Sequence, residues 1–334
     1  MNKIEKGLEE VRNSLQSLAS IKKVDDYGMF QMTYFGDYGF DDYLKVGTNF
    51  DEEIDTTYNP IPGSACTMFV TRNDKGEVLV GRNMDFYHAG NDVSPSLQVK
   101  TNPDNGYSSV STINLIFAGY SKDNLPSGLD LNSVDTLVAP YMPMDGMNEK
   151  GVTIGIVAVP QAQAPSDKNK VTINSLDLVR LVLDKAENVA QAIELMKQYN
   201  VYFPYGITCQ YLIADSSGRS VIVNFADGEA IVTEVDENYQ ICSNFAACNP
   251  GNREGGCEFE RYDKVKDCIE RNGGSLTDAQ AVDLLTEVGG YNRNAETGDK
   301  FDILQWSAVY NLTTLDGVIF ANRKKDSLIN FSLN

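Results

Sequence analysis

The first 22 residues carry apolar side chains at alternating spacings of four and three positions. The residues that form this stripe are Ile4, Leu8, Val11, Leu15 and Leu18. Such a spacing keeps side chains on one face of an α-helix. The pattern therefore predicts an amphipathic helix over residues 3–22. A stripe of this kind can bind a partner or pack against the protein's own domain, and we expect it to pack on its own domain.

After an aromatic segment at 29–44, which is expected to lie against the main body, apolar runs alternate with turn residues. They predict strands over 67–71, 78–81, 111–120, 152–159, 209–214, 220–225, 230–235, 239–243, 306–312 and 317–322. Helical spacing predicts one or two helices over 175–199, and further helices over 258–271 and 278–288, with Asn174 as an N-cap and residues 145–151 as a turn. Hairpins with intervening helices indicate antiparallel sheets covered by helices, an α+β fold.

The stretch around Cys66 places reactive residue types at the two ends of a predicted hairpin. An apolar strand follows Cys66, a turn occupies residues 73–76, and the returning strand ends on Arg82 and Asp85. Pairing of the strands should bring Arg82 and Asp85 next to Cys66. A thiol beside a cation and a carboxylate is typical of an activated nucleophile. The competing interpretation is an ordinary buried strand cysteine with a structural ion pair nearby.

The residues directly before Cys66, at 59–65, include prolines, a glycine and other small residues. They interrupt regular structure and could serve only as a linker. They also permit a strained turn, from which the Cys66 thiol could attack the carbonyl of Ala65. Cleavage there would make Cys66 the first residue of a new chain.

The chain has a single histidine, His88. Any mechanism with a Cys–His or Ser–His–Asp arrangement must therefore use His88. It follows the hairpin closely, so a Cys66–His88 pair stays open, although a lone histidine in a loop is more often solvated.

Composition and charge exclude several classes of function. The formal net charge of −19 disfavours binding to nucleic acids and to anionic membranes. Six widely spaced cysteines indicate reduced thiols rather than a disulfide framework or a zinc site. We found no signal peptide, no segment long enough for membrane insertion and no cofactor motif, and we expect a cytoplasmic location without metal or cofactor.

Five short motifs occur in order along the chain, at 66–85, 145–151, 243–245, 260–262 and 306–312. In sequence they read CT…GRNMD, DGMNEKG, SNF, ERY and WSAVYNL. They resemble, in the same order, motifs of the choloylglycine hydrolases and penicillin V acylases, which are N-terminal-nucleophile hydrolases, and the resemblance covers roughly residues 66–322. Each motif alone is weak, and their common order makes the resemblance specific.

The resemblance implies a four-layer αββα fold, in which two antiparallel sheets lie between helix layers. It also implies hydrolysis of linear amide C–N bonds. Carried over by position, Cys66 would be the nucleophile and Arg82 would lie beside its thiolate. Asp85 would hold the free amino group, Asn244 would form part of the oxyanion hole, and Arg261 would orient the site.

A mechanism without histidine follows from this set, because a freed α-amine titrates near pH 8 and can take the proton of the adjacent thiol. Attack on an amide would give a thioester, which water then hydrolyses. In the loop after residue 160, the bile-salt enzymes carry an Asn and the penicillin enzymes a Tyr, whereas this chain has Gln-Ala-Gln at 161–163. The resemblance therefore predicts neither bile salts nor penicillin V as the substrate. Ala162 and Gln163 are the predicted substrate-binding residues, and a backbone N–H near Ala162 is the predicted second oxyanion donor.

The 65 residues before Cys66 resemble the leading segment of acid-ceramidase-type amidases. We therefore divide the chain into residues 1–65, an autocleaved prosegment or small subunit, and a catalytic domain at 66–334. The expected partner is a small-molecule N-acyl amide, and a homo-oligomer stays open. An acyltransferase with the same thioester, or a non-catalytic binding protein, are the alternatives to a hydrolase.

Overall fold

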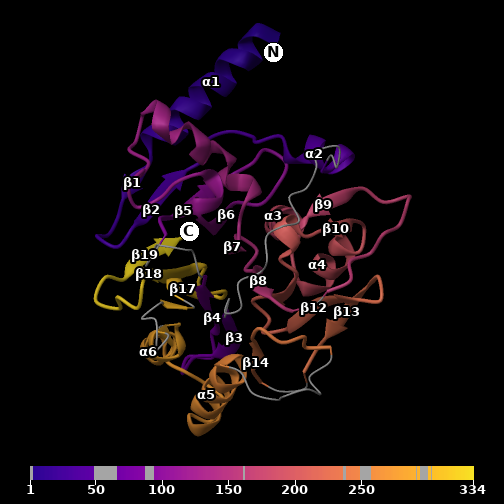
Figure 1. The fold of residues 1–334 in the computed structure, drawn as a ribbon, viewed down its shortest axis with the longest axis vertical. Helices are drawn as coiled ribbons and strands as arrows, with labels where there is room; N and C mark the ends of the chain where they lie inside the picture. Colours follow the sequence, from indigo (N-terminus) through magenta and orange to yellow (C-terminus); the bar gives the residue numbers. More distant parts are fainter. Residues whose placement is uncertain are drawn as a thin grey trace.

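Two β-sheets lie face to face in this protein, and helices cover their outer faces (Figure 1). The computed structural model describes residues 3–48, 66–86, 94–160, 162–235, 238–248, 257–290, 292–293, 300–301 and 303–334. The statements below concern these residues.

The larger sheet has nine strands. Their order is β1 (Lys22–Lys23), β2 (Met29–Thr33), β5 (Ser96–Thr101), β6 (Ser109–Asn114), β7 (Asp145–Asn148), β8 (Thr153–Ala158), β11 (Cys209–Ala214), β12 (Ser220–Ala226) and β13 (Glu229–Thr233). Neighbouring strands are antiparallel, except that β2 runs parallel to β5.

The smaller sheet has six antiparallel strands. Their order is β14 (Gln240–Cys242), β3 (Thr67–Arg72), β4 (Val78–Asp85), β17 (Leu304–Asn311), β18 (Asp316–Ala321) and β19 (Ile329–Ser332). One buried apolar cluster joins the two sheets. Met68 and Val80 enter it from the smaller sheet, and Met147, Val157 and Leu212 enter it from the larger sheet.

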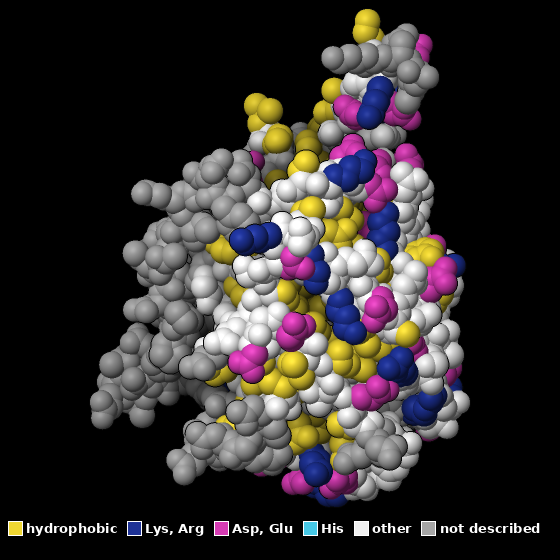
Figure 2. All heavy atoms as spheres, turned by 90° about the vertical axis from the view of Figure 1, so that its right-hand side faces the viewer, with side chains coloured by type: hydrophobic (Ala, Val, Ile, Leu, Met, Phe, Trp, Pro, Cys, Tyr) yellow, Lys and Arg dark blue, Asp and Glu magenta, His cyan; other side chains and the backbone are white. Residues whose placement is uncertain are grey.

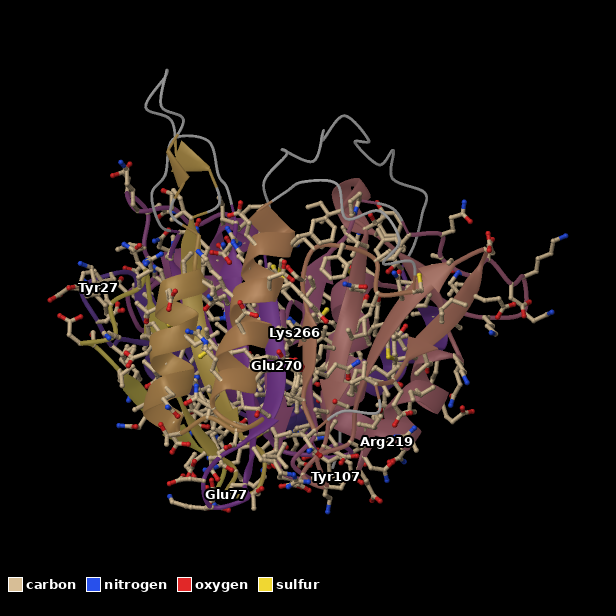
Figure 3. All side chains as sticks on the ribbon, turned by 90° about the horizontal axis from the view of Figure 1, so that it is seen from below. Tyr27, Glu77, Tyr107, Arg219, Lys266 and Glu270 are labelled. Carbon is tan, nitrogen blue, oxygen red and sulfur yellow. The ribbon has the colours of Figure 1, made fainter. Side chains whose placement is uncertain are left out.

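Helices cover both outer faces. On the larger sheet lie α3 (Ser175–Lys185) and α4 (Val189–Met196), and on the smaller sheet lie α5 (Cys257–Arg271) and α6 (Asp278–Val288). Figure 3 shows the latter two in front of the strands. On α5 the side chains of Val265 and Ile269 are buried, whereas Lys266 and Glu270 form an exposed ion pair at 3.8 Å. The predicted αββα arrangement is confirmed.

The remaining described elements are short or peripheral. They are α1 (Lys3–Ala19), α2 (Phe40–Val46), the 3₁₀ segments η1 (Leu115–Ala118), η2 (Leu131–Tyr141) and η3 (Pro204–Gly206), the parallel pair β9 (Thr172–Asn174) and β10 (Asn200–Tyr202), and the antiparallel pair β15 (Asn292–Arg293) and β16 (Lys300–Phe301).

Two sequence-based predictions of local structure were wrong. Residues 145–148, predicted as a turn, form the buried strand β7, and the turn follows it, with Gly151 at a φ of +73°. The Asn148 side chain accepts from the backbone N–H groups of Lys150 and Val152, which is why a polar residue ends this strand. The strand predicted over 111–120 ends at Asn114, whose side chain caps η1.

Residues 29–43 belong to the body of the fold rather than to an appendage. Strand β2 pairs with β5 inside the larger sheet. The Tyr38 hydroxyl donates to the Asp184 carboxylate at 2.6 Å, and Arg180 pairs with the same carboxylate at 3.1 Å. All three side chains are buried. A division of the chain at residue 65 stays a prediction, and a leading fragment would be anchored by these contacts.

The predicted stripe of α1 does not pack on its own domain, contrary to our expectation. Leu18 is buried, but Ile4, Leu8, Val11 and Leu15 are between 48% and 75% exposed. Figure 1 shows why: α1 projects from the body and touches it only near its C-terminal end. None of the described helices is both long and apolar enough to cross a membrane.

The carboxyl group of Asp177 makes the stability of the fold depend on pH. It caps α3 by accepting from the Asn174 backbone N–H at 3.1 Å, and the Tyr43 hydroxyl donates to the same oxygen. Its other oxygen is buried without a hydrogen-bond partner among the described residues. Burial raises the pKa of Asp177 to about 6.

Because this folded-state pKa lies above the unfolded value of about 3.9, the folded protein binds the extra proton between about pH 4 and pH 6. Protonated Asp177 therefore contributes fully to the free energy of unfolding below pH 4, and this contribution is lost as the pH rises through 6. As the pH rises from 4 to 7, the free energy of unfolding of Asp177→Asn should increase by up to about 3 kcal/mol relative to that of the wild type, because asparagine does not titrate. Denaturant unfolding of both proteins across this range measures the difference, and parallel pH curves would contradict the expectation.

Candidate active site

Cys66 lies directly before β3, at the end of the predicted hairpin. The β3–β4 register pairs Thr67 with Asn83 and Met68 with Arg82, so the end of β4 returns beside Cys66. The hairpin is therefore confirmed. The Cys66 side chain is only 3% exposed, and it belongs to the cluster between the two sheets.

The sulfur of Met84 contacts both the thiol of Cys66 and the guanidinium of Arg82. The Met84 sulfur is 3.7 Å from the Cys66 sulfur, and the Arg82 Nη2 donates to it at 3.0 Å. The Arg82 Nη1 is buried and has no hydrogen-bond acceptor among the described residues. Burial alone would lower the pKa of Arg82, but the charges of Cys66 and Asp145 raise it, so the guanidinium stays charged. An unsatisfied cationic donor beside a thiol favours an anion at that place.

A buried carboxylate holds the other side of Arg82. Asp145, on β7 of the facing sheet, accepts from Arg82 Nε at 3.2 Å, from Trp306 Nε1 at 3.0 Å and from the Tyr310 hydroxyl at 2.6 Å. All four side chains are completely buried. Burial and the charge of Asp145 raise the pKa of Tyr310 well above its usual value, so its hydroxyl keeps the proton that it donates.

Sequence reasoning missed this contact, because it used Asp145 only as part of a motif and treated the segment around Trp306 as core strand. The signal that could have found it is an aspartate that directly follows the apolar run at 137–144. Such a carboxylate needs donors when it is buried.

The side chain of Asp85 points to the face of β4 opposite to that of Arg82, since side chains alternate along a strand. Its Oδ2 lies 3.3 Å from Nη1 of Arg261 on α5, and its Oδ1 accepts from the backbone N–H of Gly290. Both charged side chains are buried. Although it lies on this face, Asp85 lines the same cavity as Cys66, because both residues stand at strand ends.

Asn244 follows β14 in a loop that passes Cys66. The Ser243 hydroxyl lies 3.5 Å from the Cys66 carbonyl oxygen, and Asn244 Nδ2 donates to the Ala158 carbonyl oxygen at 2.8 Å. Gln210, on β11, fixes this loop by donating to the carbonyl oxygens of Ser243 at 2.9 Å and Phe245 at 2.8 Å. Sequence reasoning gave Gln210 no role, because a glutamine inside a strand carries no distinctive pattern.

A cavity of about 230 Å³ lies next to the thiol. Besides Cys66 and Asp85, its wall is mainly apolar and includes Met84, Phe86, Phe117, Met144, Ile156 and Leu176. Apolar walls with a few polar groups at one end are typical of sites for small organic ligands.

The two predicted substrate-binding residues lie outside this wall. Ala162 packs against the cluster under α3 and α4. Gln163 is exposed, its backbone N–H donates to the Phe225 carbonyl oxygen at 3.0 Å, and its side chain accepts from Asp227 at 3.1 Å. A contact with substrate stays a prediction for both. His88 and the bond between residues 65 and 66 lie outside the described residues.

Within the described ranges, the His, Cys, Asp and Glu side chains form no group of three or more that could hold a metal ion.

Comparison with known proteins identifies the family of this chain. The chain resembles a mutant of the conjugated bile acid hydrolase from Clostridium perfringens, with a TM-score of 0.57, 16% identity, and coverage of 80% of this chain and 92% of that one. It also resembles penicillin V acylase from Agrobacterium tumefaciens, with a TM-score of 0.53, 16% identity, and coverage of 77% and 83%. At such identities these likenesses confirm the fold.

The search of curated proteins returned no match. Residues 66–244, more than half of the 334-residue chain, match the family model described as linear amide C–N hydrolases, choloylglycine hydrolase family. This range begins at the candidate nucleophile and ends at the candidate oxyanion donor. The chain therefore belongs to the choloylglycine hydrolase family of linear amide C–N hydrolases.

Proposed function

We propose that the protein hydrolyses an N-acyl amide with an apolar acyl group, using Cys66 as nucleophile after cleavage of the bond between Ala65 and Cys66. The observation that carries the proposal is the position of the thiol, which lies beside a buried guanidinium and forms part of the wall of an apolar cavity. An acyl chain in that cavity would bring its carbonyl carbon to the sulfur.

Cleavage supplies the base. The freed α-amine of Cys66 titrates near pH 8 and takes the proton of the thiol. The sulfur attacks the amide carbonyl carbon, and the carbonyl oxygen becomes an oxyanion. As the C–N bond breaks, the α-ammonium returns a proton to the leaving amine, and a thioester remains. Water, deprotonated by the same amine, then releases the carboxylic acid and the thiol.

The surrounding residues have separate roles in this scheme. Asp85, itself paired with Arg261 at 3.3 Å, orients the new amino group. Arg82 stabilises the thiolate with its unsatisfied N–H. Asn244 offers a side-chain N–H to the oxyanion, a contact that can be worth about 3 kcal/mol in the transition state. The second oxyanion donor is a backbone N–H near Ala162.

The substrate class follows from the wall of the cavity. Its methionine, phenylalanine and aliphatic side chains fit an acyl group without charge. Bile acid conjugates and penicillin V, the substrates in the names of the two similar proteins, are both N-acyl compounds with apolar acyl parts. Ala162 and Gln163 are assigned to the amine half of the substrate, outside the acyl cavity.

Three measurements on the full chain test the proposal. Intact mass and N-terminal analysis report whether a chain begins at Cys66. A panel of N-acyl amides of different acyl length reports turnover, and acid quenching during turnover traps an acyl group on the Cys66 peptide. Free carboxylic acid as product supports hydrolysis. Transfer to an added amine instead would identify an acyltransferase, and absence of any turnover by a chain that begins at Cys66 would leave a binding protein.

Met142, which lines the cavity, sets the acyl length in this scheme. Met142→Trp fills part of the space and is expected to lower kcat/KM for long acyl chains at least about tenfold relative to short ones, since one or two excluded methylenes are worth about 1–3 kcal/mol. Met142→Ala enlarges the space and should shift the preference towards longer chains. Equal effects on short and long substrates would contradict the assignment of the acyl cavity.

A further inference from the structure

The projecting part of α1 carries an apolar face that its own domain leaves exposed. Leu18 anchors the C-terminal end of the helix in the cluster that contains Leu97 and Ile113. Towards the N-terminus the apolar side chains face outwards, and their exposed fractions are 48% for Leu15, 58% for Val11, 64% for Leu8 and 75% for Ile4. Figure 2 shows hydrophobic side chains among charged ones on this helix, away from the body.

The spacing of these residues is that of a coiled-coil seam. With Leu8 and Leu15 at position a of a heptad, Ile4, Val11 and Leu18 occupy position d. The same phase fixes the residues that flank the seam. Position e holds Glu5 and Arg12, and position g holds Gly7 and Ser14.

This distribution of charge selects an orientation. In a parallel pair of helices, e residues face g residues, and here the g positions carry no charge. In an antiparallel pair, e residues face e residues, so Glu5 of each helix meets Arg12 of the other. Two such ion pairs form by symmetry when Leu8 packs beside the partner subunit's Val11. Charge complementarity at flanking positions is what sets helix orientation in coiled coils.

The shape of the protein favours the same orientation. Because α1 joins the body at its C-terminal end, an antiparallel pair keeps the two bodies at opposite ends of the helix pair (Figure 1). A parallel pair would bring both bodies to one end.

We infer that two copies of this chain associate through an antiparallel pair of α1 helices. The seam has only five a and d positions, fewer than an isolated coiled coil needs. The base of α1 contacts η2, where Leu131, Val134 and Val138 are 91%, 42% and 43% exposed. The N-terminal end of the partner's helix would lie over these side chains, which extends the apolar contact. A twofold dimer is also the commonest form of homo-oligomer.

Sedimentation velocity and light scattering of the full chain test the inference at concentrations from roughly 1 to roughly 200 μM, where interfaces of modest size associate. The wild type should show the dimer mass at the upper end. Leu8→Lys, at a side chain that is 64% exposed on the projecting part of α1, should give a monomer throughout. A wild type that stays monomeric over the whole range, or a dimer that survives Leu8→Lys, would overturn the inference.

The orientation has its own test. Arg12→Glu places Glu5 opposite a second glutamate and should raise the dimer dissociation constant roughly tenfold or more. Lys6→Glu makes the same change of charge at a position that faces away from the seam, and should have little effect. The double variant Glu5→Arg/Arg12→Glu restores the pairing and should recover the dimer. Equal weakening by Arg12→Glu and Lys6→Glu, without recovery in the double variant, would exclude the antiparallel arrangement.

Discussion

Replacing Cys66 by alanine is expected to abolish turnover of every N-acyl amide and to leave one uncleaved chain of full mass. Both effects have the same cause, because the proposed mechanism uses this one sulfur first against the Ala65 carbonyl and then against the substrate. Loss of a nucleophile lowers kcat by roughly 10⁴-fold or more in comparable enzymes. Intact mass and an N-acyl amide assay on the same preparation measure the two losses together.

Cys209 provides a matched control for this experiment, since it lines the same cavity and is equally buried. Burial raises the pKa of Cys209 to about 12, which keeps it a neutral thiol. Cys209→Ala should therefore retain both cleavage and turnover. Activity that survives Cys66→Ala, or that disappears with Cys209→Ala while the protein stays folded, would contradict the assignment of the nucleophile.

The sequence predicted the elements whose causes are local. The hairpin around residues 73–76 follows from a turn sequence between apolar runs, and its returning strand brings Arg82 beside Cys66 and Asp85 to the wall of the same cavity. The helix over 278–288 and the N-cap at Asn174 likewise depend on side chains within a few positions. The layered fold and the family were accessible because five motifs occur in a fixed order.

Contacts between the sheets were not accessible in this way. Asp145 and Asn148 look like turn residues, yet they end up in a buried strand because distant groups satisfy them. Trp306 and Tyr310 donate to Asp145, and the carbonyl oxygens of Leu183 and Ala186 accept from Asn148. A propensity reports what a residue prefers near its own backbone, whereas these partners lie 35 to 165 positions away.

The stripe of α1 shows a different limit. Its spacing correctly predicts a helix with one apolar face, but spacing does not say whether that face meets its own domain or another molecule. The answer depends on where the helix joins the body. Here α1 ends at Ala19, directly after Leu18, which is the only residue of the stripe that is buried.

The second large effect is expected from Asp145→Asn, which should lower kcat by roughly 10²–10³-fold with little change in KM. Arg82, Trp306 and Tyr310 all donate to this side chain. An asparagine has one acceptor oxygen, and its amide N–H groups face donors, so the guanidinium loses the partner that holds it. Moving a catalytic charge by about 1 Å can cost a factor of roughly 100. The acyl cavity does not include Asp145, so substrate binding should change little.

Breaking a buried ion pair also costs stability, typically about 3–5 kcal/mol, so activity alone would not separate positioning from folding. The ratio of Cys66 alkylation by iodoacetate to that by iodoacetamide separates them under conditions where each variant is folded, because a change in access to the thiol affects both reagents equally, whereas a change in local charge affects only the anionic one. With Asp145 neutral, the uncompensated charge of Arg82 should raise this ratio several-fold. In Arg82→Met the ratio should fall, and Tyr310→Phe, which removes one donor and no charge, should leave it unchanged. A ratio that stays constant in all three variants would mean that Asp145 stabilises the fold without positioning Arg82 at the thiol.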